Sequence, residues 1–408
     1  MTTEPAALAE NPVGVLPELR LKPREDKRLA AGHLWVFSNE VDTARTPLTA
    51  FEPGAPCRIV SSQERFLGYG YVNPHALICA RILGRDPGFP PGKSLLVHRL
   101  QVALALRERI YAKPFYRLVY GESDGLPGLV LDRYGDVVVG QIGTAGMEAL
   151  KPAILAALLK VIAPQTLIWK NDSGARDLEG LPSYVETAHG PTVEEIVVEE
   201  DGVRFFVPMG HGQKTGWFYD QVANRHALLK YVAGKRVLDV FCYLGAWGLA
   251  AARAGASEVV CVDSSATALE TLQRTAQANA LPVRIERGDA FDVLAALRAA
   301  GEKFDVVVID PPAFIKRRKD IPKGQAAYRK LNQSAMQLLQ HDGILVSCSC
   351  SHHLGQDDLI HAIQQSARHL DRFAQVVEVG GHAPDHPLHP AIPETRYLKS
   401  LFCRVLHE

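Results

Sequence analysis

The C-terminal half of the sequence predicts an α/β fold built on a doubly wound, parallel β-sheet. From about Val197, short apolar segments alternate with amphipathic segments of helical period, the order that repeated strand–helix–strand units produce. The chain has 408 residues, and a single core stops growing at roughly 250–300 residues, so we expect other domains to precede this sheet. Seven segments have strand character, at residues 236–241, 259–263, 283–289, 304–310, 343–350, 373–380 and 398–406.

The first part of the chain predicts a small, mostly β domain at residues 18–92. Short strand-like segments lie between Leu19 and Leu83, separated by Pro and Gly residues. Residues 1–17 are rich in Pro, Ala and Glu and have no periodicity, which is typical of a disordered tail.

A linker and a second domain follow. Residues 85–93 are rich in Pro and Gly, which indicates a domain boundary. Beyond it, two helical segments and several strand-like segments predict a compact α+β domain at residues 93–195, without a motif that indicates chemistry. The remaining residues, 196–408, form the predicted doubly wound domain.

The overall composition excludes several classes of protein. The sequence is 47% hydrophobic and 22% charged, as in an average globular protein. Its seven cysteines are scattered without CxxC spacing, which argues against disulfides and against a zinc site and favours reduced thiols in the cytoplasm. No apolar run reaches the roughly 20 residues of a membrane span, and the N-terminus does not resemble a secretion signal, so we expect no membrane association.

Acidic residues at the ends of the first three predicted strands indicate a nucleoside cofactor. Ligands of open α/β sheets bind at the carboxyl ends of the strands. Asp239 lies in the first strand, Asp263 closes the second, and Asp289 follows the third, while Gly245 allows close approach of the turn after the first strand. The GxGxxG spacing of a dehydrogenase is absent, so the sequence predicts S-adenosylmethionine as the cofactor.

The fourth and fifth strands predict a catalytic pair. The fourth ends in Asp310, followed by two prolines and then Phe314, which suits an acid that bonds a base edge and a ring that stacks on a flipped nucleotide. The fifth ends in Ser-Cys-Ser-Cys-Ser, and alternation alone does not choose between Cys348 and Cys350. Cys350 is favoured because it lies closer to the carboxyl end of its strand, where ligands bind. A buried structural cysteine is the common alternative.

A cysteine opposite an acid suits methylation of carbon 5 of a pyrimidine. That carbon is a poor nucleophile until a thiolate adds to carbon 6 and makes it enamine-like. A base must then remove the proton from carbon 5 so that the thiolate can leave.

Local basic segments predict contacts with phosphates. The 45 Lys and Arg residues balance the 45 Asp and Glu residues, so net charge does not indicate nucleic-acid binding and any such surface must be local. The usual alternative is that a run of charged residues faces solvent and binds nothing. The predicted substrate contacts are Arg20, Lys22 and Arg24 near the N-terminus and Lys316, Arg317, Arg318 and Lys319 after Phe314.

Several stretches, taken together, resemble the bacterial 23S ribosomal RNA large subunit methyltransferase I family from about Leu19 to Leu406. They are GHLWVFSNEV, FLGYGYVNPHALICARIL, YRLVYGESDGLPGLVLDRYGD, GQKTGWFYDQVANR, DPPAF, SCSCS and PETRYLKSLFCRVL. The resemblance implies an N-terminal PUA-like RNA-binding domain, a middle α+β domain and a seven-stranded Rossmann-like class I methyltransferase domain. It further implies 5-methylcytosine formation in large-subunit ribosomal RNA.

The resemblance also implies roles for individual residues. Cys350 matches the nucleophile, Asp310 the acid after strand four, and Glu394 is a candidate for the base that removes the proton, although an ordinary surface Glu is the alternative. The implied cofactor set is Gln213, Lys214, Thr215, Phe218, Asp220, Asp239, Tyr243, Gly245, Asp263, Ser264, Asp289, Ala290 and Asp310.

Two other functions stay open from the sequence. An Asp-Pro-Pro-aromatic motif also serves methylation of an exocyclic amine, such as N2 of guanine, although the aromatic residue here comes one position later and a nucleophilic cysteine would be superfluous. An inactive RNA-binding or ribosome assembly factor is the second alternative. Whether naked RNA or an assembly intermediate is the substrate, and whether the chain forms a homodimer, also stay open.

Overall fold

The computed structural model describes residues 16–209 and 215–407. Contacts divide the chain into two compact units, and each is described by itself. Unit 1 comprises Met1–Glu194, His211–Trp217 and Asp385–Thr395, and unit 2 comprises Glu195–Gly210, Phe218–Pro384 and Arg396–Glu408. The predicted tail falls almost wholly outside the described residues, as do the predicted cofactor residues Gln213 and Lys214.

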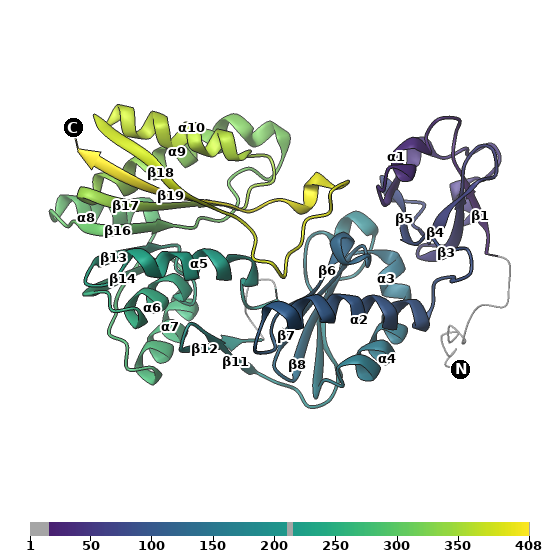
Figure 1. Cartoon of the computed structure of the whole chain (residues 1–408), viewed down its shortest axis with the longest axis horizontal. Coiled ribbons are helices and arrows are strands. Elements are labelled where there is room, and N and C mark those ends of the chain that lie inside the picture. Colours follow the sequence, from purple (N-terminus) through teal and green to yellow (C-terminus); the bar gives the residue numbers. More distant parts are fainter. Residues whose placement is uncertain (1–15, 210–214, 408) are drawn as a thin grey trace. The chain divides into compact units, whose positions relative to one another are not determined.

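The N-terminal part of unit 1 is a five-stranded sheet, as predicted (Figure 1). Apolar residues of these strands fill a core around Leu19, Ile59 and Ile82. The order is β1-β3-β4-β5-β2. The strands are β1 (Glu18–Arg20), β2 (Trp35–Phe37), β3 (Ala55–Val60), β4 (Phe66–Val72) and β5 (Ile78–Gly84), with a short helix α1 (Lys27–Ala30).

The middle part of unit 1 is a second five-stranded sheet with helices α2 and α4 packed together. The second of the two helical segments predicted for this domain is divided at Leu150, which belongs to neither α3 nor α4. The last strand, β10, was not predicted, because its sequence, YVETAH, is largely polar and its side chains are partly exposed. The order is β10-β9-β8-β7-β6. The elements are α2 (Lys93–Ile110), β6 (Phe115–Tyr120), β7 (Leu129–Tyr134), β8 (Val137–Ile142), α3 (Ala145–Ala149), α4 (Lys151–Val161), β9 (Thr166–Asn171) and β10 (Tyr184–His189).

A segment from near the C-terminus completes unit 1. Arg107 of α2, which is wholly buried, pairs with Asp124 at 2.6 Å and donates to the Asp385 carbonyl oxygen at 2.7 Å. The Tyr120 hydroxyl donates to the carbonyl oxygen of Thr395 at 2.7 Å. Since the Arg107 charge is buried and these donors point at backbone oxygens, residues 385–395 are held firmly in this unit.

Unit 2 contains the predicted seven-stranded sheet, in the order β15-β14-β13-β16-β17-β19-β18. The expectation of a wholly parallel sheet is wrong for one strand, because β19 runs antiparallel to both β17 and β18. No long helix joins β18 to β19, and parallel neighbours require such a crossover. The strands are β13 (Arg236–Val240), β14 (Glu258–Asp263), β15 (Arg284–Arg287), β16 (Phe304–Ile309), β17 (Leu339–Ser349), β18 (Arg372–Gly380) and β19 (Lys399–His407).

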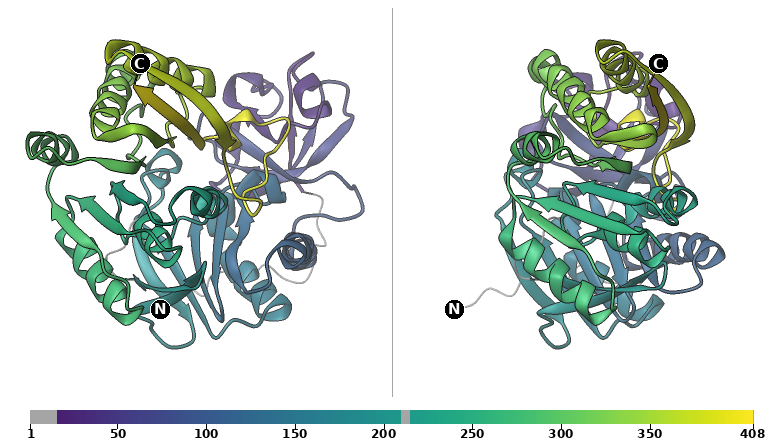
Figure 2. Two further views of the ribbon diagram at one scale, coloured as in Figure 1. Left: turned by 60° about the vertical axis from the view of Figure 1, so that its left-hand side comes forward. Right: turned by 90° about the vertical axis from the view of Figure 1, so that its left-hand side faces the viewer.

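Helices cover both faces of this sheet (Figures 1 and 2). Leu238 and Val240 of β13 face the core under α8, α9 and α10, whereas Val237 faces the core under α5, α6 and α7. The helices are α5 (Val222–Leu228), α6 (Ala246–Arg253), α7 (Ala266–Ala278), α8 (Ala290–Ala299), α9 (Ile321–Gln337) and α10 (Gln356–His369). An additional hairpin, β11 (Glu195–Glu200) with β12 (Val203–Pro208), packs on α7.

Close packing at Gly140 in the middle sheet leads to a prediction about stability. A Cβ atom on Gly140 in β8 would overlap the ring of the wholly buried Trp169. We expect Gly140→Ala to lower the free energy of unfolding by about 2 kcal/mol in urea titrations, because the core must shift to admit it. Gly135→Asn is the control, since Gly135 has φ +65° and open space around its Cβ position, which Asn tolerates. Equal stability of the two variants would contradict the close packing at Gly140.

Candidate active site

Asp239, at the end of β13, is a wholly buried carboxylate. Its Oδ2 accepts a hydrogen bond from the Gly248 backbone N–H at 2.9 Å, at the start of α6. Its Oδ1 has no hydrogen-bond partner among the described residues. Burial raises the pKa of Asp239 to about 7, and the nearby charge of Asp310 adds to that shift while the Gly248 bond opposes it. A buried acid with an unsatisfied oxygen is costly to the fold, which indicates a role in binding.

Asp263, at the end of β14, shapes the loop after β13. Its Oδ2 accepts from the Tyr243 N–H and its Oδ1 from the Ser265 N–H, both at 2.9 Å. Phe241 and Tyr243 have φ of 65° and 50°, which L-residues rarely adopt, so the Asp263 bond helps to hold a strained turn. Gly245, with φ +77°, precedes α6. This loop therefore has one set conformation beside the strand ends.

Asp310 follows β16 directly and is held by two side chains. Its Oδ2 accepts from Trp247 Nε1 at 3.1 Å and from Gln221 Nε2 at 3.0 Å. Burial raises the pKa of Asp310 to about 6, Asp220 raises it further, and the Trp247 and Gln221 bonds oppose the shift. An acid with a pKa near neutrality suits proton transfer or hydrogen bonding to a base edge.

Sequence reasoning missed the residues that hold these acids. Gln221, Trp247 and Tyr397 were not predicted, although Gln221 and Tyr397 lie inside quoted stretches and Trp247 lies two residues after Gly245. The Tyr397 hydroxyl donates to Asp220 Oδ2 at 2.6 Å, and Asn224 donates to Gln221 Oε1 at 2.6 Å. The only sequence signal for them was that they lie within or near those motifs, because a donor is recognised only by what it faces.

The structure distinguishes the two candidate cysteines. Cys348 is wholly buried in β17, where its thiol donates to Ser400 Oγ at 3.3 Å, and burial raises its pKa far above the ordinary value. Cys350 lies one residue past the end of β17 and is partly exposed. Since a nucleophile must ionise and reach substrate, Cys350 is the better candidate of the two.

Hydrogen bonds fix the chain on both sides of Cys350. Ser349 Oγ and Ser351 Oγ each lie 2.9 Å from the Tyr328 hydroxyl of α9. Ser351 Oγ also accepts from the Ile315 N–H at 3.1 Å. The serines of the motif thus tie the strand end to α9 and to the segment after Asp310, so the intervening thiol has a defined position.

Lys399, at the start of β19, is a buried cation next to this motif. It pairs with Ser349 across the two strands, and its Nζ donates to the carbonyl oxygens of Ser351 at 2.6 Å and Tyr397 at 2.8 Å. Burial lowers the pKa of Lys399 to about 8, and the negative charge of an ionised Cys350 opposes that shift. The same attraction favours the thiolate, because electrostatic coupling is mutual. Lys399 was not predicted, since it lies about 50 residues from the motif in sequence.

The predicted substrate contacts differ in their surroundings. Phe314 packs its ring on Tyr328, with centroids 4.9 Å apart, while Ala313 beside it is partly exposed. Lys22 and Arg24 are exposed, but Arg20 is 9% exposed and pairs with Glu18 and Glu64, so it has little capacity left for a phosphate. The predicted cations after Phe314 are all exposed: Lys316, Arg317, Arg318 and Lys319.

Of the predicted catalytic and cofactor residues that the structure describes, two belong to unit 1. Thr215 is buried in unit 1, where its hydroxyl donates to Asp132. Glu394 is exposed on the short 3₁₀ helix at Pro393–Thr395, also in unit 1. The other predicted cofactor residues that the structure describes are in unit 2. There Ser264 and Asp289 are exposed near the ends of β14 and β15, Ala290 is buried, and Phe218 contacts Tyr243 with ring centroids 5.7 Å apart.

The residues present fit S-adenosylmethionine. Carboxylates follow three neighbouring strands and supply acceptors for hydroxyl and ammonium groups, and the unsatisfied Oδ1 of Asp239 is one such acceptor. The sheet order with one antiparallel strand, together with these acids and a cysteine after the fifth strand, defines a class I S-adenosylmethionine-dependent methyltransferase.

Comparisons with known proteins agree with this class. A family model described as an S-adenosylmethionine-dependent methyltransferase matches residues 180–402, and one for a PUA-like domain matches residues 19–85. The chain is 36% identical to the ribosomal RNA large subunit methyltransferase I of Photobacterium profundum, over 94% of this chain and 98% of that one. It is 35% identical to the protein of the same name from Escherichia coli O1:K1, over 95% and 99%. The chain belongs to the ribosomal RNA large subunit methyltransferase I family.

The fold is also that of a solved structure. SMU.776, crystallised in complex with SAH, superposes with a TM-score of 0.81 at 20% identity, over 95% of this chain and 100% of that one. Among the residues that the structure describes, no helix has the length and apolar character needed to cross a bilayer.

Replacing the Asp239 carboxylate should raise the stability of the protein at high pH but weaken its binding of the cofactor. The pKa of Asp239 is near 7 in the folded chain and near 3.8 in an ordinary Asp, so ionisation costs stability as the pH rises between those values. We expect wild-type protein to lose on the order of 2–3 kcal/mol more unfolding free energy than Asp239→Asn between pH 5 and pH 8, measured by urea titration.

The same variant should bind S-adenosylmethionine more weakly in calorimetry at pH 8. Asp263→Asn is measured beside it, because this variant also removes a carboxylate at the end of a neighbouring strand, but one that is only partly buried. If Asp239→Asn binds the cofactor with unchanged affinity, Asp239 does not contribute to cofactor binding.

Proposed function

We propose that the chain transfers a methyl group from S-adenosylmethionine to carbon 5 of a cytosine in large-subunit ribosomal RNA. The names of the relatives support ribosomal RNA as the substrate, and the PUA-like match supports RNA binding. The observation that carries the choice of carbon 5 is Cys350, a partly exposed cysteine held between two serines at the mouth of a methyltransferase sheet.

The proposed mechanism begins with Cys350. Its thiolate adds to carbon 6 of the cytosine, forming a carbon–sulfur bond and making carbon 5 electron-rich. S-adenosylmethionine would supply a methyl group on a cationic sulfur. Carbon 5 takes this methyl group as a new carbon–carbon bond forms, and the bond from the methyl group to sulfur breaks to leave a neutral thioether. A base then takes the proton from carbon 5, the carbon–sulfur bond breaks, and Cys350 is regenerated as the thiolate.

Asp310 is proposed to hold the base edge. Its Oδ2 is committed to Trp247 and Gln221, and it follows β16, the strand beside the one that ends before Cys350. A carboxyl group with a pKa of about 6 is present in both protonation states near neutrality, so it can accept from the exocyclic amine or donate to ring nitrogen 3. Donation to nitrogen 3 would draw electrons from carbon 6 and favour thiolate addition.

The proton-removing base stays a prediction. Glu394 has the required chemistry and an exposed carboxylate, but it belongs to unit 1. The outward-facing cations from Lys316 to Lys319 and the exposed Lys22 and Arg24 are proposed to contact RNA phosphates.

Cys350→Ala tests the covalent route, with Cys348→Ala as the matched control two residues away. We expect Cys350→Ala to abolish both 5-methylcytidine formation and the covalent complex with RNA that contains 5-fluorocytidine, in which the proton that must leave is replaced by fluorine. Cys348→Ala should keep both. Mass spectrometry of ribosomal RNA nucleosides and denaturing gels are the measurements. Persistent methylation by Cys350→Ala would overturn the proposal and favour methylation of an exocyclic amine.

Lys399→Met tests whether the buried cation assists Cys350. Without the ammonium the thiolate is less favoured, so the acidic limb of the rate–pH profile should move up by about one pH unit, with an activity loss of about tenfold at pH 7. Lys399→Arg keeps the positive charge and should restore the limb. A uniform loss at every pH in Lys399→Met would instead indicate a purely structural role.

A further inference from the structure

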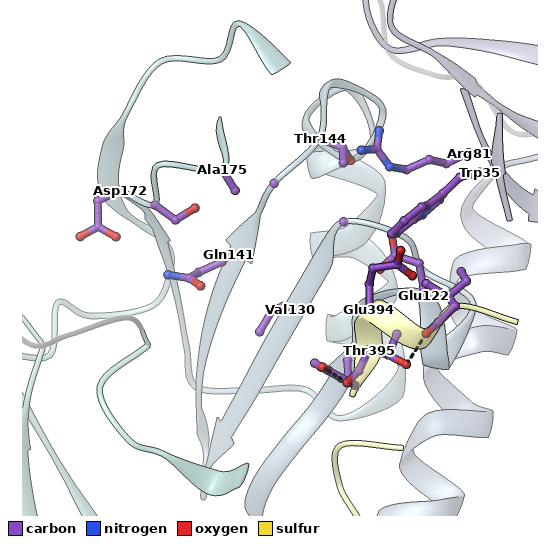
Figure 3. Close-up of a pocket in the computed structure, with 16 residues that line it drawn as sticks. Trp35, Arg81, Glu122, Val130, Gln141, Thr144, Asp172, Ala175, Glu394 and Thr395 are labelled. Carbon is purple, nitrogen blue, oxygen red and sulfur yellow. Dashed lines mark hydrogen bonds between the residues drawn. The ribbon is translucent and has the colours of Figure 1, made fainter. Parts of the chain in front are cut away.

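Unit 1 contains a cavity of about 740 Å³ whose lining residues, apart from the candidate base Glu394, have no part in the proposed chemistry (Figure 3). Trp35 of β2 lines one side of it with Glu122 and Glu394, and Gln141 of β8 and Asp172 line the opposite side. All of its lining residues lie in the described part of unit 1. The cavity is thus formed jointly by the PUA-like sheet, the middle sheet and the segment 385–395.

One wall of the cavity is the ring of Trp35, which neighbouring side chains hold in position. Trp35 is half-buried, and its Nε1 donates to Glu122 Oε1 at 2.9 Å. The ring of His33 meets Trp35 edge-on, with centroids 5.5 Å apart. A large ring held on two sides in this way is prepared for stacking, because little side-chain entropy remains to be lost.

Acceptor groups line both sides of the cavity. The side chains of Gln141, Asp172 and Glu394 make no hydrogen bond or ion pair with any described residue. Glu394 lies within electrostatic range of His33, since its charge opposes the lowering of the His33 pKa by burial. The cavity therefore has an unpaired carboxylate on each side, Glu394 beside Trp35 and Asp172 on the opposite side, and each can only accept hydrogen bonds while ionised.

The charges in the wall disfavour a phosphate. Arg81 is the single cation among the lining residues, and it is paired with the buried Glu179 at 2.7 Å. Arg81 is itself nine-tenths buried, and its Nε lacks a hydrogen-bond partner among the described residues. A neutral group with an aromatic face and several donors fits this wall.

We propose that this cavity binds an unstacked guanine of the RNA, with the base on Trp35 and its N1–H and N2–H groups on the Glu394 carboxylate. Guanine presents two adjacent donors on that edge and an acceptor, O6, next to them. Adenine and cytosine place an acceptor beside their single amine, and uracil has one N–H between two carbonyl groups, so each would set an acceptor against a carboxylate. The inference rests on the proposed RNA substrate but not on the covalent mechanism.

The test uses the full chain and fluorescein-labelled ribo-oligonucleotides UUGUU, UUAUU, UUCUU and UUIUU, where inosine lacks only the 2-amino group of guanine. Fluorescence anisotropy without cofactor measures binding. We expect UUGUU to bind about tenfold or more tightly than UUIUU, because the lost bond is to a charged acceptor. Equal affinities for the two would overturn the proposal. Guanosine monophosphate as competitor distinguishes a nucleotide pocket from one that requires the RNA chain.

Matched variants assign the preference to the cavity. Glu394→Gln should lose the preference for guanine over inosine, whereas Asp177→Asn, the same charge change at an exposed site outside the cavity, should keep it. Trp35→Ala should weaken all four oligonucleotides by about tenfold through lost stacking, and Trp35→Phe should restore part of the affinity. A preference that survives Glu394→Gln would contradict the proposed contact.

Gly143→Leu tests the cavity independently, in case the Trp35 variants fail to fold. Gly143 lines the cavity, and a Cβ there would lie 3.6 Å from its nearest neighbour, the Gly128 carbonyl oxygen, so a Cβ is accommodated at this position and a leucine is expected to occupy part of the cavity. This variant should also lose the preference. Cys350→Ala should keep it, so failure of the guanine site and failure of the cysteine mechanism give different results. Intact binding by Glu394→Gln with lost methylation would assign Glu394 to proton removal instead.

Discussion

The structure of unit 2 depends on bringing three aspartates to one edge of a sheet without letting their charges push the strands apart. β13, β14 and β16 are neighbours, and each is followed or closed by an acid, Asp239, Asp263 or Asp310. Each carboxylate is held by donors from the adjacent loops and helices, and burial keeps Asp239 and Asp310 partly protonated near neutral pH. The site thus tolerates like charges because two of them ionise reluctantly.

A second network serves the nucleophile. Tyr328 from α9 and Lys399 from β19 converge on the residues around Cys350, so three elements distant in sequence define one thiol position. The antiparallel insertion of β19 beside β17 makes this possible, because it places Lys399 opposite Ser349. A wholly parallel sheet would have put the start of that strand at the other edge, and the cation with it.

Unit 1 carries a different kind of chemistry. Its cavity combines a tryptophan with carboxylates and an amide, a set suited to a base rather than to a phosphate. The segment 385–395 contributes Glu394 to this cavity and is tied to the middle domain through Arg107 and Tyr120. The C-terminal part of the chain therefore contributes to both units, through β19 in one and Glu394 in the other.

The sequence alone determined the class of fold, the seven strands, the acids at the strand ends and the methyl donor, because alternating periodicity and terminal acids are local patterns. It left Cys348 and Cys350 equivalent in orientation, and only burial within the folded sheet separated them. Tertiary structure alone brought Trp247 and Gln221 to Asp310, Lys399 to Cys350, and the Glu394 side chain into a cavity with Trp35. Such contacts join residues far apart in the chain, and no local pattern encodes which donor a buried acid will meet.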